Sequence, residues 1–269
     1  MPGRDFDCST MCLIFISIHD HPQYKLIVAA NRDEFYARKT AALSEWHDHP
    51  GIIGGRDLQA QGTWMAMARE GKIGMVTNYR DLKNIDPHAP TRGHLVTDYL
   101  IHGQGAEAYL KAVHLKASRY NGFSLVVGSA DELFFYSNYQ SKILKLVPGL
   151  YGLSNHLLDT PWPKVERGKK KMSVALSTPK VDPAVLFEVL RDEEVAPDSQ
   201  LPNTGLDIGR ERALSAMFIK SPNYGSRCST VVLVDIENNV SYTERVYDTK
   251  TFDYKENTIK WKTAPLLYH

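Results

Sequence analysis

The sequence predicts an α+β fold in which helices cover packed antiparallel sheets. Strand-like segments occur in adjacent pairs joined by short turns, and helical segments are grouped between those pairs. No linker rich in Pro, Gly or Ser divides the 269 residues, a length that one large α/β unit can reach. We therefore expect a single domain over residues 12–269, preceded by an upstream extension or tag over residues 1–11.

The predicted strands are apolar or alternating runs bounded by turn residues. The first pair is separated by His19-Asp20-His21-Pro22, and a later hairpin turns at Glu70-Gly71-Lys72. The last pair flanks Glu237-Asn238-Asn239, which tolerates positive φ. Strands are expected at residues 12–18, 25–30, 63–69, 73–78, 123–128, 133–137, 142–147, 230–236 and 240–247.

The predicted helices show apolar residues at helical spacing, for example Leu110, Val113 and Leu115 within 106–119. Their grouping between antiparallel strand pairs indicates layers of helix over sheet. Helices are expected at residues 93–102, 106–119, 162–175, 183–191 and 209–218.

Composition indicates a soluble globular protein, with 43% hydrophobic and 23% charged residues. A net charge of +1 implies no polyanionic partner, so we expect no nucleic-acid binding. No apolar run is long enough to span a bilayer, and the N-terminus lacks a signal-peptide pattern. Three cysteines favour a reducing compartment over a disulfide framework. We expect a cytoplasmic protein without a transmembrane segment.

Two copies of His-Asp-His-Pro, at His19–Pro22 and His47–Pro50, raise the alternative of a metal or haem-iron ligand pair. Asp and Pro favour turns at such points, and no third ligand stands at a recognisable spacing. We interpret both as polar turns and expect no metal site. Neither a dinucleotide-binding nor a Walker A glycine pattern is present, so nucleotide cofactors have no support.

Cys12 opens the first predicted strand, and the neighbouring strand leads into the polar quartet Asn31-Arg32-Asp33-Glu34. This arrangement places a thiol beside charges that could tune it. If residue 12 becomes the N-terminus, its α-amine, with a pKa of about 7.7–8.0, supplies a base next to the thiol. The alternative is that Cys12 is a small core residue, the commonest fate of a free cysteine.

Several short motifs occur together in one order: Met11-Cys12, the quartet, Thr77-Asn78-Tyr79-Arg80, Ser154-Asn155 and Arg227-Cys228. With this set the chain resembles the NRDE family, also called transport and Golgi organisation protein 2, from Met11 to about Asp248. The resemblance implies the N-terminal-nucleophile (Ntn) hydrolase superfamily. It therefore implies a four-layer αββα sandwich of antiparallel sheets, similar to penicillin V and bile-salt acylases.

The resemblance also implies roles for individual residues. Cys12 would be the nucleophile, Asn78 and Asn155 oxyanion donors, and Arg227 the cation that lowers the pKa of the thiol. The quartet is shifted by one place against the acylase pattern. Either Asn31 and Asp33 face the site, the pair that we include among its candidate residues, or Arg32 and Glu34 do. A salt-bridged strand end in which Arg32 pairs with Glu34 is a further alternative.

Two functions from different classes follow. The first is an amidohydrolase or acyl hydrolase that acts on non-peptide C–N or acyl bonds through Cys12 and requires no cofactor. The second is a non-catalytic carrier of haem or acyl-CoA and other lipids, which the resemblance implies because the family is linked to haem trafficking and lipid homeostasis. In either case the expected partner is a small molecule: an acyl-amide, acyl-CoA or haem.

Overall fold

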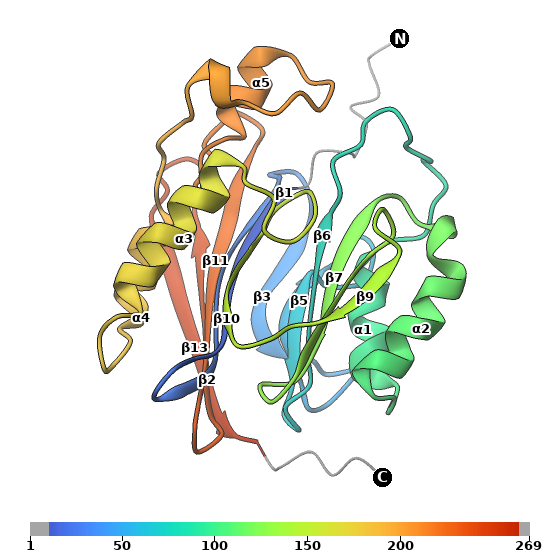
Figure 1. Cartoon of the computed structure of the whole chain (residues 1–269), viewed down its shortest axis with the longest axis vertical. Coiled ribbons are helices and arrows are strands. Elements are labelled where there is room, and N and C mark those ends of the chain that lie inside the picture. The colour runs from blue at the N-terminus through green and yellow to red at the C-terminus, as the bar shows by residue number, and fades with distance from the viewer. Residues whose placement is uncertain (1–10, 264–269) are drawn as a thin grey trace.

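The structure, a computed structural model, describes residues 11–263. Two antiparallel sheets lie face to face, with α1 (Gly93–Ile101) and α2 (Ala106–Lys116) over one outer face. The other outer face is covered by α3 (Pro163–Ala175) and α4 (Pro183–Leu190), which completes four layers (Figure 1). The expected αββα sandwich is thus confirmed. The upstream segment 1–10 lies outside the described residues.

The first sheet contains the strand that begins near Cys12. Its six strands run in the order β10 (Gly149–Leu153), β1 (Met11–His21), β2 (Tyr24–Phe35), β11 (Tyr224–Asp235), β12 (Asn239–Tyr247) and β13 (Tyr254–Lys262). Cys12 pairs with Arg32 across β1 and β2, and Cys228 pairs with Arg32 from β11 on the other side. The two cysteines and the arginine therefore form one row across three strands.

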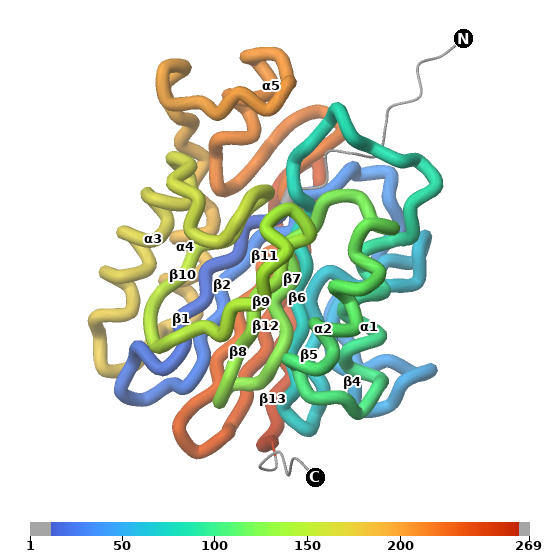
Figure 2. Tube along the Cα trace, turned by 45° about the vertical axis from the view of Figure 1, so that its right-hand side comes forward, coloured from blue at the N-terminus to red at the C-terminus, as the bar shows by residue number. Residues whose placement is uncertain are grey.

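The second sheet has seven strands in chain order, each pairing with its sequence neighbour. These are β3 (Thr40–Glu45), β4 (Ile52–Asp57), β5 (Met65–Ala68), β6 (Ile73–Asn78), β7 (Phe123–Gly128), β8 (Leu133–Ser137) and β9 (Lys142–Lys145). The short α5 (Ile208–Ala213) and the segment between β6 and α1 lie at the same end of the molecule, where β1 begins (Figures 1 and 2).

Side chains alternate between the two faces of β1, as a pleated strand requires. Ile14 and Ile16 belong to the core between the sheets, whereas Leu13 and Phe15 pack against α3 and α4. On β2, Ala30 lies in the inter-sheet core and Ala29 in the helix-side core. Even-numbered positions of β1 and β2 therefore face the opposite sheet, and this phase decides where the site residues point.

Three features of the fold differ from the prediction. β2 continues through the whole quartet to Phe35, and β11 begins at Tyr224, ahead of the expected strand. α5 ends at Ala213, and the residues 214–219 that follow it are buried. Four strands were missed: β3, β4, β10 and β13, the last being mostly exposed.

Candidate functional site

A cleft of about 590 Å³ lies between the two sheets at the end where β1 begins. Cys12, Arg32, Glu34 and Cys228 line it from the first sheet. The opposite wall comes from strands of the second sheet and from residues 85–93, a segment that includes Ile85 and two prolines. Polar side chains occupy this end of the inter-sheet layer, and apolar side chains fill the remainder.

Cys12 is 7% exposed and lines this cleft. Its Sγ accepts a hydrogen bond from the backbone N–H of Asp33, and its carbonyl accepts one from Ser154 Oγ at 3.4 Å. Burial raises the pKa of the Cys12 thiol to about 12, and the charge of Asp33 adds to this effect, while Arg32 opposes it. With residue 12 inside the chain, the thiol is therefore neutral at neutral pH.

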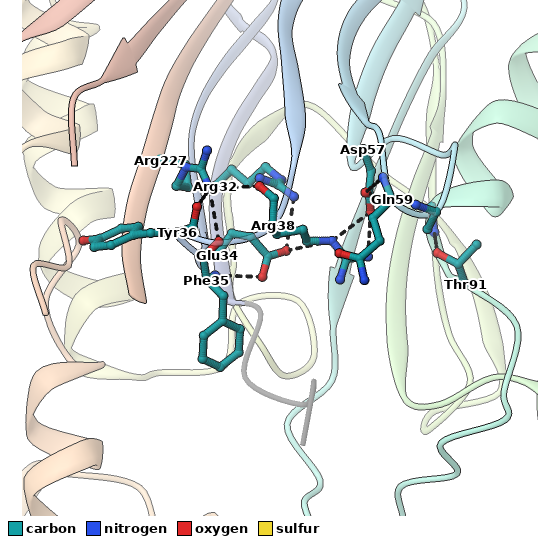
Figure 3. A network of polar contacts seen from close by, with 11 residues as sticks. Arg32, Glu34, Phe35, Tyr36, Arg38, Asp57, Gln59, Thr91 and Arg227 are labelled. Atoms are coloured by element: carbon teal, nitrogen blue, oxygen red, sulfur yellow. Dashed lines mark hydrogen bonds and ion pairs between the residues drawn. The ribbon is translucent and has the colours of Figure 1, made fainter. Parts of the chain in front are cut away.

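The quartet divides between the two faces of β2. Arg32 and Glu34 follow the even-numbered phase and line the cleft, with Arg32 Nη2 donating to Glu34 Oε2 at 3.1 Å. Of the two orientations left open, the one in which Arg32 and Glu34 face the site is therefore found, and their ion pair lies inside the cleft. It continues through Arg38, which lies 3.5 Å from Glu34 and 2.7 Å from Asp57 at the end of β4 (Figure 3).

Asn31 points away from the cleft toward the helical layer. Its Nδ2 donates to the carbonyls of Leu190 and Met217, each at 2.8 Å, and its Oδ1 accepts from Ser229 Oγ at 2.6 Å. These bonds join β2 and β11 to the ends of segments in the helical layer. Our placement of Asn31 in the site is not supported, because the alternation of the strand directs it to the other face.

Asp33 is also on the helix-side phase, yet it lies at the end of the paired region and borders the cleft. Its Oδ1 accepts from Ser226 Oγ at 2.5 Å, and its Oδ2 has no hydrogen-bond partner among the described residues. Burial raises the pKa of this carboxyl, against the opposing charges of Lys164 and Arg32. Asp33 is thus next to Cys12 but approaches it from the helix-covered face of the sheet.

Asn78 and Asn155 are brought together from different sheets. Asn155 Nδ2 donates to the backbone carbonyl of Asn78 at 3.1 Å, and Thr77 Oγ1 donates to the carbonyl of Ser154 at 2.9 Å. Asn78 is half-buried and lines the cleft, whereas Asn155 is 1% exposed and is not part of the cleft wall. Asn155 therefore supports Asn78, and Asn78 is the amide that faces the cleft.

Arg227 occupies a β-bulge, since the register passes from Ser226 opposite Asp33 to Cys228 opposite Arg32. Its Nη1 donates to the carbonyls of residues 35, 36 and 38 at 2.9–3.1 Å, so it holds the chain that follows β2 (Figure 3). The expectation that Arg227 lowers the pKa of Cys12 needs correction. Arg32 is the guanidinium that acts on the thiol.

Sequence reasoning left Arg32 and Glu34 as an alternative pair and did not identify the partner of Cys228. The inward phase of β1 and β2 could have identified Arg32 and Glu34, because they share the parity of Ala30. Cys228 donates to the carboxylate of Glu244 on β12, and this pairing depends on a register that the sequence does not reveal. Within residues 11–263, no cluster of three His, Cys, Asp or Glu side chains is arranged to hold a metal ion.

The fold and the site define an αββα-sandwich protein in which a cysteine at the start of an interior strand lines a polar cleft. The chain belongs to the Transport and Golgi organisation 2 family, whose sequence profile matches residues 11–249. No helix within residues 11–263 has the length and apolar character to cross a membrane.

Relatives of the chain occur in distant animals. It is 34% identical to the Transport and Golgi organization 2 homolog of Mus musculus over 277 residues, covering 93% of this chain and 99% of the relative. The Drosophila melanogaster protein is 31% identical, covering 87% and 91%. Among solved structures, the N-acylethanolamine-hydrolyzing acid amidase ortholog of Caenorhabditis elegans aligns with a TM-score of 0.48 and 10% identity, covering 82% of this chain and 92% of that one.

Proposed function

We propose that the protein is a thiol-dependent hydrolase of non-peptide amide or acyl bonds, active in the form whose first residue is Cys12. The observation that carries the proposal is the position of the thiol. Cys12 lines a cleft of about 590 Å³, in register with Arg32 and next to Asp33. A nucleophile needs access to its substrate together with a nearby base, and the α-amine of residue 12 would be that base.

The proposed reaction proceeds through an acyl-thioester. The thiol proton moves to the α-amine as Sγ bonds to the carbonyl carbon of the substrate. The C–N bond then breaks, and the α-amine gives the proton to the leaving amine. Water attacks the thioester, releases the carboxylic acid and restores the thiol. One amide and one water are consumed, and no cofactor takes part.

Asn78 is the proposed donor to the oxyanion, because it lines the cleft and Asn155 binds its carbonyl. Removing one such donor typically lowers kcat by about 10²–10³. Arg32 would stabilise the thiolate as it forms, since its charge already lowers the pKa of Cys12 against burial.

A second candidate function is carriage of haem or acyl-CoA without catalysis. Two observations favour it: the volume of the cleft, and the neutral state of the Cys12 thiol when residue 12 is internal. A carrier needs the cleft alone. It has no need of a free α-amine.

The test compares protein that begins at Cys12 with protein that retains residues 1–11, using acyl-amide and acyl-thioester probes. We expect turnover only from the first form, because an amide nitrogen at residue 12 cannot accept the thiol proton. Cys12→Ser in that form should keep the fold and lose most turnover, and Cys228→Ser is the matched control. Equal binding of haem or acyl-CoA by both forms, without turnover by either, would replace the hydrolase with the carrier.

A further inference from the structure

Lys164 is a buried cation with no role in the cleft described above. It lies in the first turn of α3, its side chain is 2% exposed, and its Nζ has no hydrogen-bond partner among residues 11–263. A buried ammonium without a partner is costly, and the N-terminal end of a helix further disfavours positive charge. Buried polar atoms normally have a hydrogen-bond partner, so a further group beyond the described contacts is expected at Lys164 Nζ.

Asp33 has a carboxylate oxygen that lacks a hydrogen-bond donor within residues 11–263, just as Lys164 Nζ lacks an acceptor. Its Oδ2 is fully buried and has no hydrogen-bond partner among the described residues, while Oδ1 is occupied by Ser226. Lys164 and Asp33 stabilise each other's charged forms electrostatically, yet no hydrogen bond joins them. A carboxylate oxygen that lacks a donor and an ammonium that lacks an acceptor therefore lie near each other on the same side of the sheet.

The backbone of residue 12 lies beside this pair. Met11 is the register partner of Asp33, so the nitrogen of Cys12 belongs to the strand segment next to that carboxylate. Lys164 also interacts electrostatically with Cys12. The other charged groups near Lys164 are Arg80 and Glu211, which form a buried ion pair with each other at 2.6 Å.

We propose that Lys164 is a positioning residue, which together with Asp33 receives the α-amino group of Cys12 when that residue is the N-terminus. The inference rests on the form of the protein invoked in the proposed function. A neutral α-amine has N–H groups for Asp33 Oδ2 and a lone pair for Lys164 Nζ, so it would satisfy both orphan atoms. An amide nitrogen has no basic lone pair and can satisfy the carboxylate alone.

The chemical consequence concerns the base. An adjacent ammonium disfavours protonation of the α-amine, and the Asp33 carboxylate favours it. Lys164 would thus keep the α-amine neutral and able to accept the thiol proton. Arg80 acts in the same direction as Lys164, and Glu211 in the opposite direction. Removing Lys164 should make the α-amine more basic, and removing the Asp33 charge should make it less basic.

The test is an NMR titration of the α-amine that does not depend on turnover. Protein beginning at Cys12 is labelled with ¹³C at cysteine, where Cys228 is the other labelled residue. The ¹³Cα shift of Cys12 is followed from pH 6 to pH 10. We expect Lys164→Met to raise the apparent pKa of the α-amine by about one unit or more. Lys169→Met, which removes a partly exposed lysine from the same helix, should leave it unchanged.

Asp33→Asn gives a second variant that keeps an acceptor for Ser226, and we expect it to lower the same pKa. Opposite shifts from the two variants support the inference even if no probe is hydrolysed, in which case the hydrolase proposal fails alone. Circular dichroism establishes that each variant is folded. The same α-amine pKa in both folded variants and in wild type would overturn the inference, whatever the turnover.

Discussion

Arg32 lies between the two cleft thiols, because Cys12 on β1 and Cys228 on β11 are its register partners on either side. Its charge lowers the pKa of both thiols, but burial dominates and raises both above the ordinary range. The thiols also differ in their partners. Cys228 donates to Glu244, whereas Cys12 accepts from the backbone of Asp33. Glu244 thus accepts the proton of the Cys228 thiol, whereas none of the described contacts accepts the proton of the Cys12 thiol. A thiol whose proton can be transferred to a base suits a nucleophile.

Asn31 should act on stability. Asn31→Ala removes the donors to the carbonyls of Leu190 and Met217 and leaves Ser229 without its acceptor. We expect a loss of about 2–4 kcal/mol in the free energy of unfolding, measured by urea titration. Asn84→Ala, at an exposed position, should change it by less than about 0.5 kcal/mol. An Asn31→Ala protein with the same free energy of unfolding as wild type would contradict the structural role of Asn31.

Glu244 should make stability depend on pH. Burial raises the pKa of this carboxyl in the folded state, against the opposing effects of Leu43 N–H, Cys228 and Arg32. The folded state therefore holds the proton more tightly than the unfolded state, and this contribution to stability is lost as pH rises above about 4.3 through the folded pKa. In urea titrations from pH 4.5 to 7.5, the free energy of unfolding should fall less steeply with pH in Glu244→Gln than in wild type. The two slopes should differ by at most about 1.4 kcal/mol per pH unit. Parallel profiles would contradict this.

The chemistry of the site was more predictable than its orientation. Cys12, Asn78 and Asn155 were identified from short motifs, and the structure brings all three to one place. The quartet was left with two orientations, because a shift of one residue exchanges the faces of a strand, and only the parity shared with Ala30 distinguishes them. Lys164 gave no signal, since a lysine in the first turn of a charged helix normally lies in solvent.

At the level of elements, the packing of α3 against β1 holds the strand that carries Cys12. Gly168 on α3 lies directly over Phe15, and a Cβ built on that glycine would be 2.0 Å from Phe15 Cζ. Strands with apolar or alternating runs were predictable, as were the helices that cover them. β13 was not, because it is mostly exposed and lies on an edge where only one neighbour pairs with it.

Gly168→Ala should push α3 away from β1. The steric clash outweighs the gain in helix propensity, so we expect a net loss of about 1–3 kcal/mol in the free energy of unfolding. The double variant Gly168→Ala/Phe15→Leu should recover part of that loss. Gly103→Ala, where a Cβ meets nothing within 4 Å, is the matched control. Thermal denaturation compares the stability of the three variants with that of wild type. A Gly168→Ala protein as stable as wild type would contradict the close contact between Gly168 and Phe15.

At the level of the whole molecule, polar contacts between the two sheets surround the cleft. Glu244 on β12 accepts from the backbone of Leu43 on β3 at 2.6 Å, and Thr77 at the end of β6 donates to Ser154 beyond β10. The Arg38–Asp57 ion pair adds a third connection between the chain after β2 and β4 (Figure 3). These contacts hold the sheets together where side chains do not fill the space, so the cleft can stay open.

The central claim is that Cys12 forms a covalent acyl intermediate. The most direct measurement is intact and peptide mass spectrometry of protein beginning at Cys12, quenched in acid within seconds of mixing with an acyl-thioester probe. We predict one acyl adduct per chain on the peptide containing Cys12. The adduct should persist longer in Asn78→Ala, if Asn78 also stabilises the hydrolytic transition state. Acylation of Cys228 in place of Cys12, or no adduct while the probe is consumed, would contradict the account.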